Sequence, residues 1–318
     1  MSVIKITKEK RIDVLWDKYI AECKLSGYAE DTLRNKEHYF SVFYEFLNGN
    51  HEVDKLTQET LNRFTEARIA TGIKEISVNS CSVVLNAFLR WLYEHSYTKT
   101  FLKIQKLKVQ QTVKETYTSE ELKRLLIKPD LTPDAFSDYR TWVIINYILG
   151  TGNRLSSVLT LKICDIDLES GYVRLAHTKN KNSQLTPLPS SLIFILKDYL
   201  DIRGGNKEDF LFCTLHGEQL TRSGANKALL RYCDRRMVDS LGHHAFRHTF
   251  AKISVRDCHI DSFRLQRLLG HKNIKTTEHY VHLYADDLRE NLDTYNPLEH
   301  LLQQNQPKER IRLKGGRA

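Results

Sequence analysis

Residues 11–100 carry apolar side chains at helical spacing, and no stretch among them alternates like a strand. One pattern starts at Ile12, a second ends at Leu47, a third follows Thr57, and a fourth runs from Ser77 to Glu94. Several helices within so short a segment are typical of a small helical bundle. The first part of the chain is therefore expected to be entirely helical.

The helical pattern lapses between residues 98 and 117, where the sequence TKTFLKIQKLKVQQTVKETY is rich in Lys and Gln. We interpret this stretch as the connection between domains, basic enough to lie along a phosphate backbone. Thr118 and Glu121 then form a capping box ahead of an apolar run, which starts a second domain. The predicted units are a helical domain at 1–108, a linker at 109–117, a second domain at 118–295 and a C-terminal tail at 296–318.

The second domain mixes structure types. Apolar residues 142–149 predict a helix that ends at GTG, and another helix begins near Arg154. The sequence GYVRLAHTKNKNSQLTPLP (171–189) alternates around an Asn/Lys-rich turn, which predicts an antiparallel hairpin. DFLFCTL (209–215) predicts a short strand, and helices continue to about residue 291. The expected fold class is mainly α with a small antiparallel β-sheet (α+β).

Composition narrows the partners and the compartment. The 318 residues are enough for about two domains, and the net charge of +9 favours an anionic partner such as nucleic acid or a membrane surface. The six cysteines contain no CxxC pair, which excludes a disulfide scaffold and a cysteine zinc framework. The N-terminus is too charged for a signal peptide, and no apolar run is long enough to span a membrane. A cytoplasmic protein without a membrane partner is expected.

Four islands in the second domain concentrate chemically active side chains. Each alone has an ordinary reading: a surface charge, a solvated hairpin lysine or a core aromatic. His244 and His248 have a spacing that suits a metal ion on a helix, but HExxH and a clear third ligand are missing, so no metal is expected. The islands are GTGNRLSSVLTL with Arg154, TKNKNSQLTP with Lys179 and Lys181, HHAFRHTFA with His244, Arg247 and His248, and LGHKNIKTTEHY with His271 and Tyr280.

Taken together, these residue types suit transfer at a phosphodiester. Arginine presents a fixed bidentate fork to non-bridging phosphate oxygens. Such chemistry gains mainly from stabilising the charge that develops at phosphorus. Tyrosine has an ordinary pKa of about 10, so it needs cationic neighbours or a base to act as a nucleophile. Lysine can protonate a leaving alkoxide.

These motifs resemble the tyrosine recombinases, the phage-integrase family. HHAFRHTFA resembles the His-x-x-Arg-His box and implies His244 and Arg247 as site residues. LGHKNIKTTEHY is similar to the closing box, in which the nucleophilic Tyr280 follows His271 by nine residues. TGNRLSSVLTLKICDID resembles the first arginine box and implies Arg154. The family's hairpin lysine stands eight residues before a proline, which selects Lys179 over Lys181. The resemblance runs from about residue 11 to 290.

Two departures and one rival accompany the resemblance. Ser157 stands where the family often has an acidic residue three positions after the first arginine, so that supporting role passes elsewhere or is absent. Phe246 replaces a common Leu, which is a harmless apolar change. Tyr284 lies one helical turn beyond Tyr280, but the spacing from His271 favours Tyr280.

The resemblance implies a site-specific DNA recombinase that works through a 3′-phosphotyrosyl link, without cofactor or metal. Arg154 and Arg247 would clamp the phosphate, Lys179 would protonate the leaving 5′-oxygen, His244 would assist proton transfer at Tyr280, and His271 would bind a non-bridging oxygen. The implied partners are double-stranded DNA recombination sites and a homotetramer on two such sites, with accessory factors undefined. The tail, with Leu298, Leu301 and Leu302, is a candidate for docking on a neighbouring protomer.

Other classes share this chemistry. A type IB topoisomerase relaxes DNA without exchange between sites, a catalytically inactive relative only binds DNA, and a telomere resolvase is usually larger. Within the recombinases, the sequence leaves open integration or excision of a mobile element and resolution of replicon dimers. For sequence reading by the helical domain, the candidates near two helix starts are Thr32, Arg34, Ser77 and Asn79.

Overall fold

The computed structural model describes residues 9–49, 51–109, 115–130, 136–175 and 184–284. The chain divides into two compact units, Met1–Thr112 and Val113–Ala318. Each unit is described by itself.

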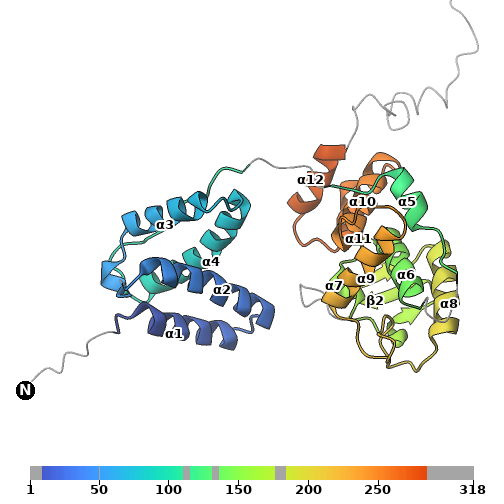
Figure 1. Ribbon diagram of the computed structural model, residues 1–318, viewed down its shortest axis with the longest axis horizontal. Coiled ribbons are helices and arrows are strands. Elements are labelled where there is room, and N and C mark those ends of the chain that lie inside the picture. The colour runs from blue at the N-terminus through green and yellow to red at the C-terminus, as the bar shows by residue number, and fades with distance from the viewer. Residues whose placement is uncertain (1–8, 50, 110–114, 131–135, 176–183, 285–318) are drawn as a thin grey trace, which may run out of the picture. The chain divides into compact units, whose positions relative to one another are not determined.

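In its described residues, the first unit is a helical bundle around an apolar core (Figure 1). Its elements are α1 (Ile12–Leu25), α2 (Glu30–Leu47), the 3₁₀ turn η1 (Val53–Lys55), α3 (Gln58–Ala70) and α4 (Glu75–Glu94). Aromatic rings fill the centre, where Trp16 of α1 stacks on Phe40 of α2 at 4.2 Å and meets Phe88 of α4 edge-on at 5.0 Å. The expected all-helical character of residues 11–100 is confirmed in its described part.

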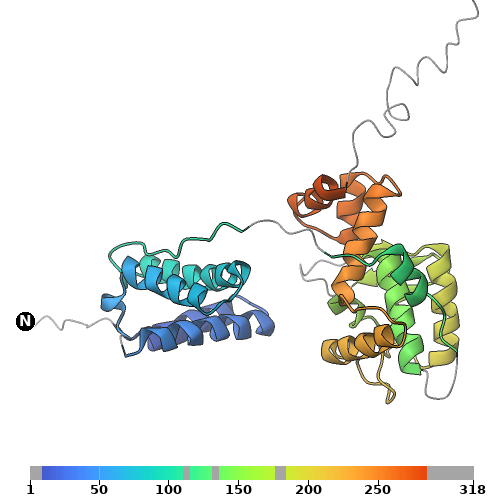
Figure 2. The same ribbon diagram turned by 45° about the horizontal axis from the view of Figure 1, so that its top comes forward.

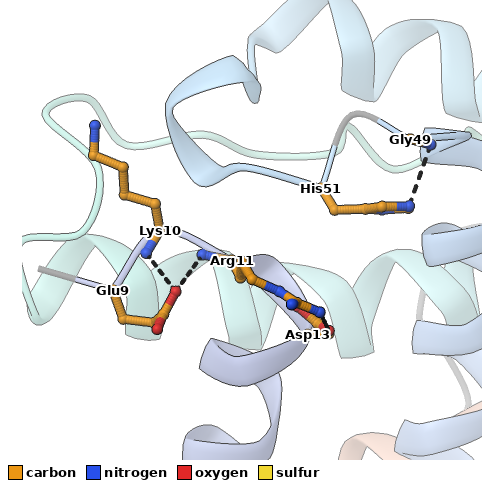
Figure 3. A network of polar contacts seen from close by, with 6 residues as sticks. All are labelled: Glu9, Lys10, Arg11, Asp13, Gly49 and His51. Atoms are coloured by element: carbon orange, nitrogen blue, oxygen red, sulfur yellow. Dashed lines mark hydrogen bonds and ion pairs between the residues drawn. The ribbon is translucent and has the colours of Figure 1, made fainter.

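Polar contacts fix the start of α1 (Figure 3). The Glu9 carboxylate accepts from the backbone N–H groups of Lys10 and Arg11, both at 2.9 Å, and the Arg11 guanidinium contacts Asp13. Such anionic groups suit a helix N-terminus, where N–H groups lack intrahelical partners. The backbone of Ile12 donates to His51, which joins α1 to the loop that follows α2.

Residues 101–107 pack onto this bundle instead of serving only as a connection. Leu102 and Ile104 are buried in its core. The amide of Asn86 exchanges two hydrogen bonds with the Ile104 backbone, at 2.8 and 2.9 Å, and the amide of Asn79 does the same with Leu107. The part of the basic stretch before residue 108 therefore packs on the bundle and is more than a connection.

The second unit surrounds α6 (Phe136–Thr151), a helix buried on all sides by the other elements. Figure 2 shows α6 and α8 side by side; α10 also packs against α6, and α12 packs against α10. Its helices are α5 (Ser119–Leu125), α6, α7 (Leu155–Val158), the 3₁₀ turn η2 (Ile163–Asp165), α8 (Ser190–Arg203), α9 (Arg222–Asp234), α10 (His243–Arg256), α11 (Ser262–Leu269) and α12 (Lys275–Tyr284).

A small antiparallel sheet lies in the second unit, in the order β1-β2-β3. The strands are β1 (Ile166–Asp167), β2 (Tyr172–Leu175) and β3 (Gln184–Pro187), and Leu175 pairs with Gln184 at the end of the β2–β3 ladder. This confirms the predicted hairpin and the mainly α fold class with a small antiparallel sheet. The tip of the hairpin lies outside the described residues.

The predicted strand at 209–215 is wrong. Within the described chain this segment makes only the isolated bridges Lys162↔Phe210 and Cys213↔Gln219. Its consecutive residues Leu211 and Phe212 are both fully buried, so the segment does not follow the alternation of a strand. No helix in the described parts of the chain is long and apolar enough to cross a membrane.

Candidate active site

Arg247 is the buried centre of the candidate site. It sits on α10 and is 5% exposed. Its guanidinium donates to the carbonyl oxygens of Gly152 and Leu269, the latter at 2.8 Å, and to Nε2 of His271 at 2.8 Å. One side chain thus joins the turn after α6 to the end of α11 and to the residue that follows it.

The turn after α6 is shaped by Gly152. Its φ is +67°, and a Cβ there would lie 2.5 Å from Phe250 and 2.9 Å from Leu269. Only glycine satisfies both the left-handed backbone and this close packing. The turn brings Arg154, the residue before α7, into the neighbourhood of Arg247.

Two neighbouring cations define the electrostatics of the site. Burial, and next the charge of Arg154, lower the pKa of Arg247 to about 10. Neither arginine forms a salt bridge with a carboxylate among the described residues. A phosphate oxygen would relieve this repulsion, so the pair has the character of an anion site.

His271 follows the end of α11. Gly270 closes that helix in the left-handed conformation with φ 61°, and the backbone N–H of His271 donates to Gln266 at 3.1 Å. A guanidinium can only donate, so Nε2 of His271 accepts from Arg247 and the ring proton lies on Nδ1, 2.9 Å from Thr277 Oγ1. Burial and the charge of Arg247 lower the pKa of His271 to about 4, so the ring is neutral at pH 7.

Tyr280 is on α12 and is 6% exposed. Its ring belongs to a small apolar cluster with residues of α10 and α11, separate from the main core. The ring is nearly parallel to that of His271, with centroids 6.5 Å apart. A helix end, a short break and a new helix therefore bring the two residues together, as their nine-residue spacing suggested.

The hydroxyl of Tyr280 lies 2.7 Å from Nδ1 of His248. This histidine was absent from the predicted site, which gave proton transfer at Tyr280 to His244. His244 is exposed at the start of α10, and burial together with the charges of Arg222 and Arg247 lowers its pKa. The contact adds His248 as a candidate for proton transfer at Tyr280, and the role of His244 stays a prediction. Residues four apart share a helix face, but spacing alone does not say which one meets the tyrosine.

The two departures from the family pattern are both buried. Ser157 lies in α7, where its backbone N–H donates to Arg154 at 3.0 Å. Phe246 stacks on Tyr117 at 4.3 Å in the core, which accounts for an apolar residue at that position. Lys179, Lys181 and the side chain of Tyr284 lie outside the described residues.

The candidate DNA-reading residues lie in the first unit. Thr32 is exposed, Arg34 is exposed and pairs with Asp31 at 2.8 Å, and Ser77 is half-buried. Asn79 differs, because both ends of its amide hold the backbone of Leu107. Its amide therefore holds the fold, and a role for Asn79 in reading DNA stays a prediction. No group of three or more metal-ligating side chains occurs within the described ranges.

Residues 115–286 match the phage integrase family. This match spans more than half of the 318 residues, so the chain belongs to the phage integrase family, that of the tyrosine recombinases. It is an enzyme of the tyrosine site-specific recombinase class.

Similar proteins carry the same class name. The chain is 27% identical over 287 residues to the tyrosine recombinase XerA of Saccharolobus solfataricus, which covers 86% of this chain and 90% of the relative. It is 27% identical over 298 residues to XerA of Pyrococcus furiosus (93% and 98%) and 26% identical over 254 residues to XerD of Staphylococcus haemolyticus (77% and 84%).

Solved structures share the fold. The Tn1549 transposon integrase in complex with a circular intermediate DNA matches with a TM-score of 0.73 and 17% identity, covering 92% of this chain and all of that one (100%). A lambda integrase dimer bound to a core site matches with a TM-score of 0.69 and 17% identity, covering 85% and 95%.

Proposed function

We propose that this enzyme recombines DNA at specific sites by cutting and rejoining strands through a 3′-phosphotyrosyl intermediate. The observation that carries the proposal is the hydrogen bond between the hydroxyl of Tyr280 and Nδ1 of His248. Close to it lies Arg247, a buried arginine that has no salt bridge with a carboxylate among the described residues. A nucleophile, a base and an anion clamp are the parts that transesterification at a phosphodiester requires.

In the cleavage step, the Tyr280 oxygen forms a bond to phosphorus as the bond from phosphorus to the 5′-oxygen breaks. His248 accepts the tyrosine proton through Nδ1, which faces the hydroxyl. Lys179 gives a proton to the departing 5′-oxygen, so a 5′-hydroxyl is released. The phosphodiester energy stays in the phosphotyrosine, and a second 5′-hydroxyl reverses the step without a nucleotide cofactor.

The remaining residues bind the phosphate. Arg154 and Arg247 take its non-bridging oxygens, because the fork of each guanidinium matches that geometry. His271 binds a non-bridging oxygen by donating from Nε2, for which the ring proton moves from Nδ1 to Nε2 as Arg247 turns to the phosphate, and Thr277 Oγ1 then donates to Nδ1. His244, exposed at the start of α10 near both arginines, binds at the same edge of the phosphate.

The partner is double-stranded DNA that contains recombination sites, in keeping with the net charge of +9. One protomer cuts one strand, and exchange between two duplexes needs four cuts, so a homotetramer on two sites is proposed. A lambda integrase tetramer bound to a Holliday junction gives this assembly a precedent in the same fold.

The tail at 296–318 is proposed to dock on a neighbouring protomer, and the enzyme is placed with its DNA in the cytoplasm. Two roles fit this chemistry, movement of a mobile element and resolution of replicon dimers.

The deciding experiment maps the covalent bond. The full chain is incubated with DNA that flanks its own gene, quenched with SDS, digested with protease and nuclease, and searched by mass spectrometry for peptides that bear a nucleotide. We expect the nucleotide on Tyr280 and its loss in Tyr280→Phe, with Tyr284→Phe as the matched control.

Each other outcome points to a named alternative. A nucleotide on Tyr284 keeps the enzyme class and overturns the nucleophile. Tight binding to the same DNA without an adduct indicates a binding protein. Relaxation of supercoiled DNA that lacks any recombination site indicates a topoisomerase.

A further inference from the structure

The last turn of α11 is held by a side chain from the sheet. Gln184 is the first residue of β3, and its Nε2 lies 3.2 Å from the carbonyl oxygens of both Arg267 and Leu268. Carbonyls at a helix C-terminus lack the N–H partners that a continuing helix would supply. The amide of Gln184 supplies a donor to the Leu268 carbonyl oxygen and a second donor to that of Arg267, which also accepts from the backbone N–H of Gly270 at 3.1 Å.

The Gln184 amide also lies close to Gly270. A Cβ on Gly270 would lie 2.3 Å from Oε1 of Gln184, and Gly270 also has a positive φ of 61°. The backbone position of Gln184 is in turn set by its pairing with Leu175 of β2. The sheet and the end of α11 therefore meet at a defined point.

This turn also makes two contacts with Arg247, which is proposed to bind the phosphate together with Arg154. The carbonyl oxygen of Leu269 and Nε2 of His271 both accept hydrogen bonds from the guanidinium of Arg247. The backbone of His271 is held as well, since Gln266 accepts from its N–H at 3.1 Å and donates to its carbonyl oxygen at 3.0 Å. A shift of the turn therefore changes the position of His271 relative to Arg247, and misplacement by about 1 Å can cost about 100-fold in rate.

We propose that Gln184 is a positioning residue of the recombinase site, which sets His271 against Arg247 by tying the last turn of α11 to the β2–β3 hairpin. The inference rests on the proposed function, in which His271 and Arg247 bind the scissile phosphate. Gln184 itself touches no reacting atom. It acts through His271. Substitutions of Gln184 and of His271 should therefore not have additive effects on the cleavage rate.

The test is a double-mutant cycle on single-turnover cleavage of a suicide DNA substrate by the full chain. Gln184→Met keeps the length of the side chain and removes its donor. We expect it to slow cleavage by about 10- to 100-fold in the wild-type background and to have no further effect in the His271→Ala background. Equal effects in both backgrounds, or no effect in either, would overturn the proposal.

A control separates positioning from general loosening of the fold. Gln219, in the same unit, also donates its Nε2 to a carbonyl oxygen, that of Leu159 at 3.1 Å. Gln219→Met removes an equivalent hydrogen bond away from His271, and we expect its cleavage rate to match that of the wild type. An equal loss of rate in Gln219→Met would count against a specific role for Gln184.

A second readout does not depend on cleavage, so failure of the proposed function is told apart from failure of this inference. The charges that lower the pKa of His271 belong to Arg247, Arg154 and His248. If Gln184 holds the ring against Arg247, Gln184→Met should raise the His271 pKa, measured by NMR titration with His271→Ala for assignment. An unchanged His271 pKa overturns the inference, even in a protein that cuts no DNA.

Discussion

Nδ1 of His248 and the hydroxyl of Tyr280 lie 2.7 Å apart, one on α10 and the other on α12. The contact joins the residue after the buried Arg247 to the proposed nucleophile. A base within hydrogen-bond reach of the proton that it removes meets the geometric condition for general base catalysis. In the proposed reaction, the tyrosine proton therefore passes to α10.

His248→Ala should slow single-turnover cleavage by about 100-fold near neutral pH, in the range of a lost general base. The deficit should shrink as the pH approaches 10, because hydroxide then removes the tyrosine proton in place of the histidine. Cleavage rates from pH 6 to 10 check both statements, with the exposed His216→Ala as the matched control. A deficit that stays constant across this range would remove His248 from the proton path.

Arg247→Lys should be far from conservative. A lysine has one nitrogen and cannot reach the carbonyl oxygens of Gly152 and Leu269 and Nε2 of His271 with a fixed fork. We expect cleavage to fall by at least about 100-fold and the free energy of unfolding to fall by about 1–3 kcal/mol as buried acceptors lose donors. Arg256→Lys, at an exposed pair with Asp257 on the same helix, should change stability by less than about 1 kcal/mol. Urea unfolding and suicide-substrate kinetics of both variants test this.

Stability should rise with pH between about 4 and 6.5. Burial lowers the pKa of both His243 and His271 to about 4, against an ordinary value of about 6.5. In this window the unfolded chain binds protons at both positions and the folded chain does not. The contribution of the two histidines to the free energy of unfolding is therefore fully present above about pH 6.5 and is lost as the pH falls towards 4.

The slope of this loss can be assigned to a residue. Each histidine contributes at most about 1.4 kcal/mol per pH unit. His243 contacts Asn226 Oδ1 at 3.1 Å, so His243→Gln keeps a polar group there and removes the titration. Urea unfolding at pH 7.5, 6.0 and 5.0 should give a shallower slope for His243→Gln than for the wild type. Parallel curves would show that His243 titrates normally.

Helical periodicity predicted the bundle because long amphipathic helices repeat their apolar residues at fixed spacing. The same reasoning missed the packing of residues 101–107, where Leu102 and Ile104 are buried without any period and are held by Asn86. An asparagine near a helix start is a candidate for reading bases, yet the amide of Asn79 hydrogen-bonds to the backbone of Leu107. Sequence alone does not say which partner a polar side chain will find.

At the candidate site, too, the sequence predicted some neighbours and missed others. Motif spacing predicted that His271 and Tyr280 come together, because a helix break and a new helix allow little else. Which histidine of α10 meets Tyr280 depends on how α10 and α12 pack, so His248 was missed. Gln184 carried no sequence signal at all, since its partners are backbone carbonyls of a segment far along the chain.

Gly152→Ala should damage stability and activity together. Any L-residue at its φ of +67° costs about 1–2 kcal/mol, and the new Cβ would also lie 2.5 Å from Phe250 and 2.9 Å from Leu269. Overpacking of this kind adds about 1–3 kcal/mol. Relief of the clash moves the Gly152 carbonyl away from Arg247 and shifts the neighbouring Arg154.

Gly217→Ala separates these two causes. Its φ is +81°, and a Cβ there would meet no heavy atom within 4 Å. It should therefore show only the backbone cost of about 1–2 kcal/mol and retain cleavage at the wild-type rate. Unfolding free energies and single-turnover rates of the two variants are compared side by side. Equal losses of stability with cleavage intact in both would mean that the Gly152 turn does not position the arginine clamp.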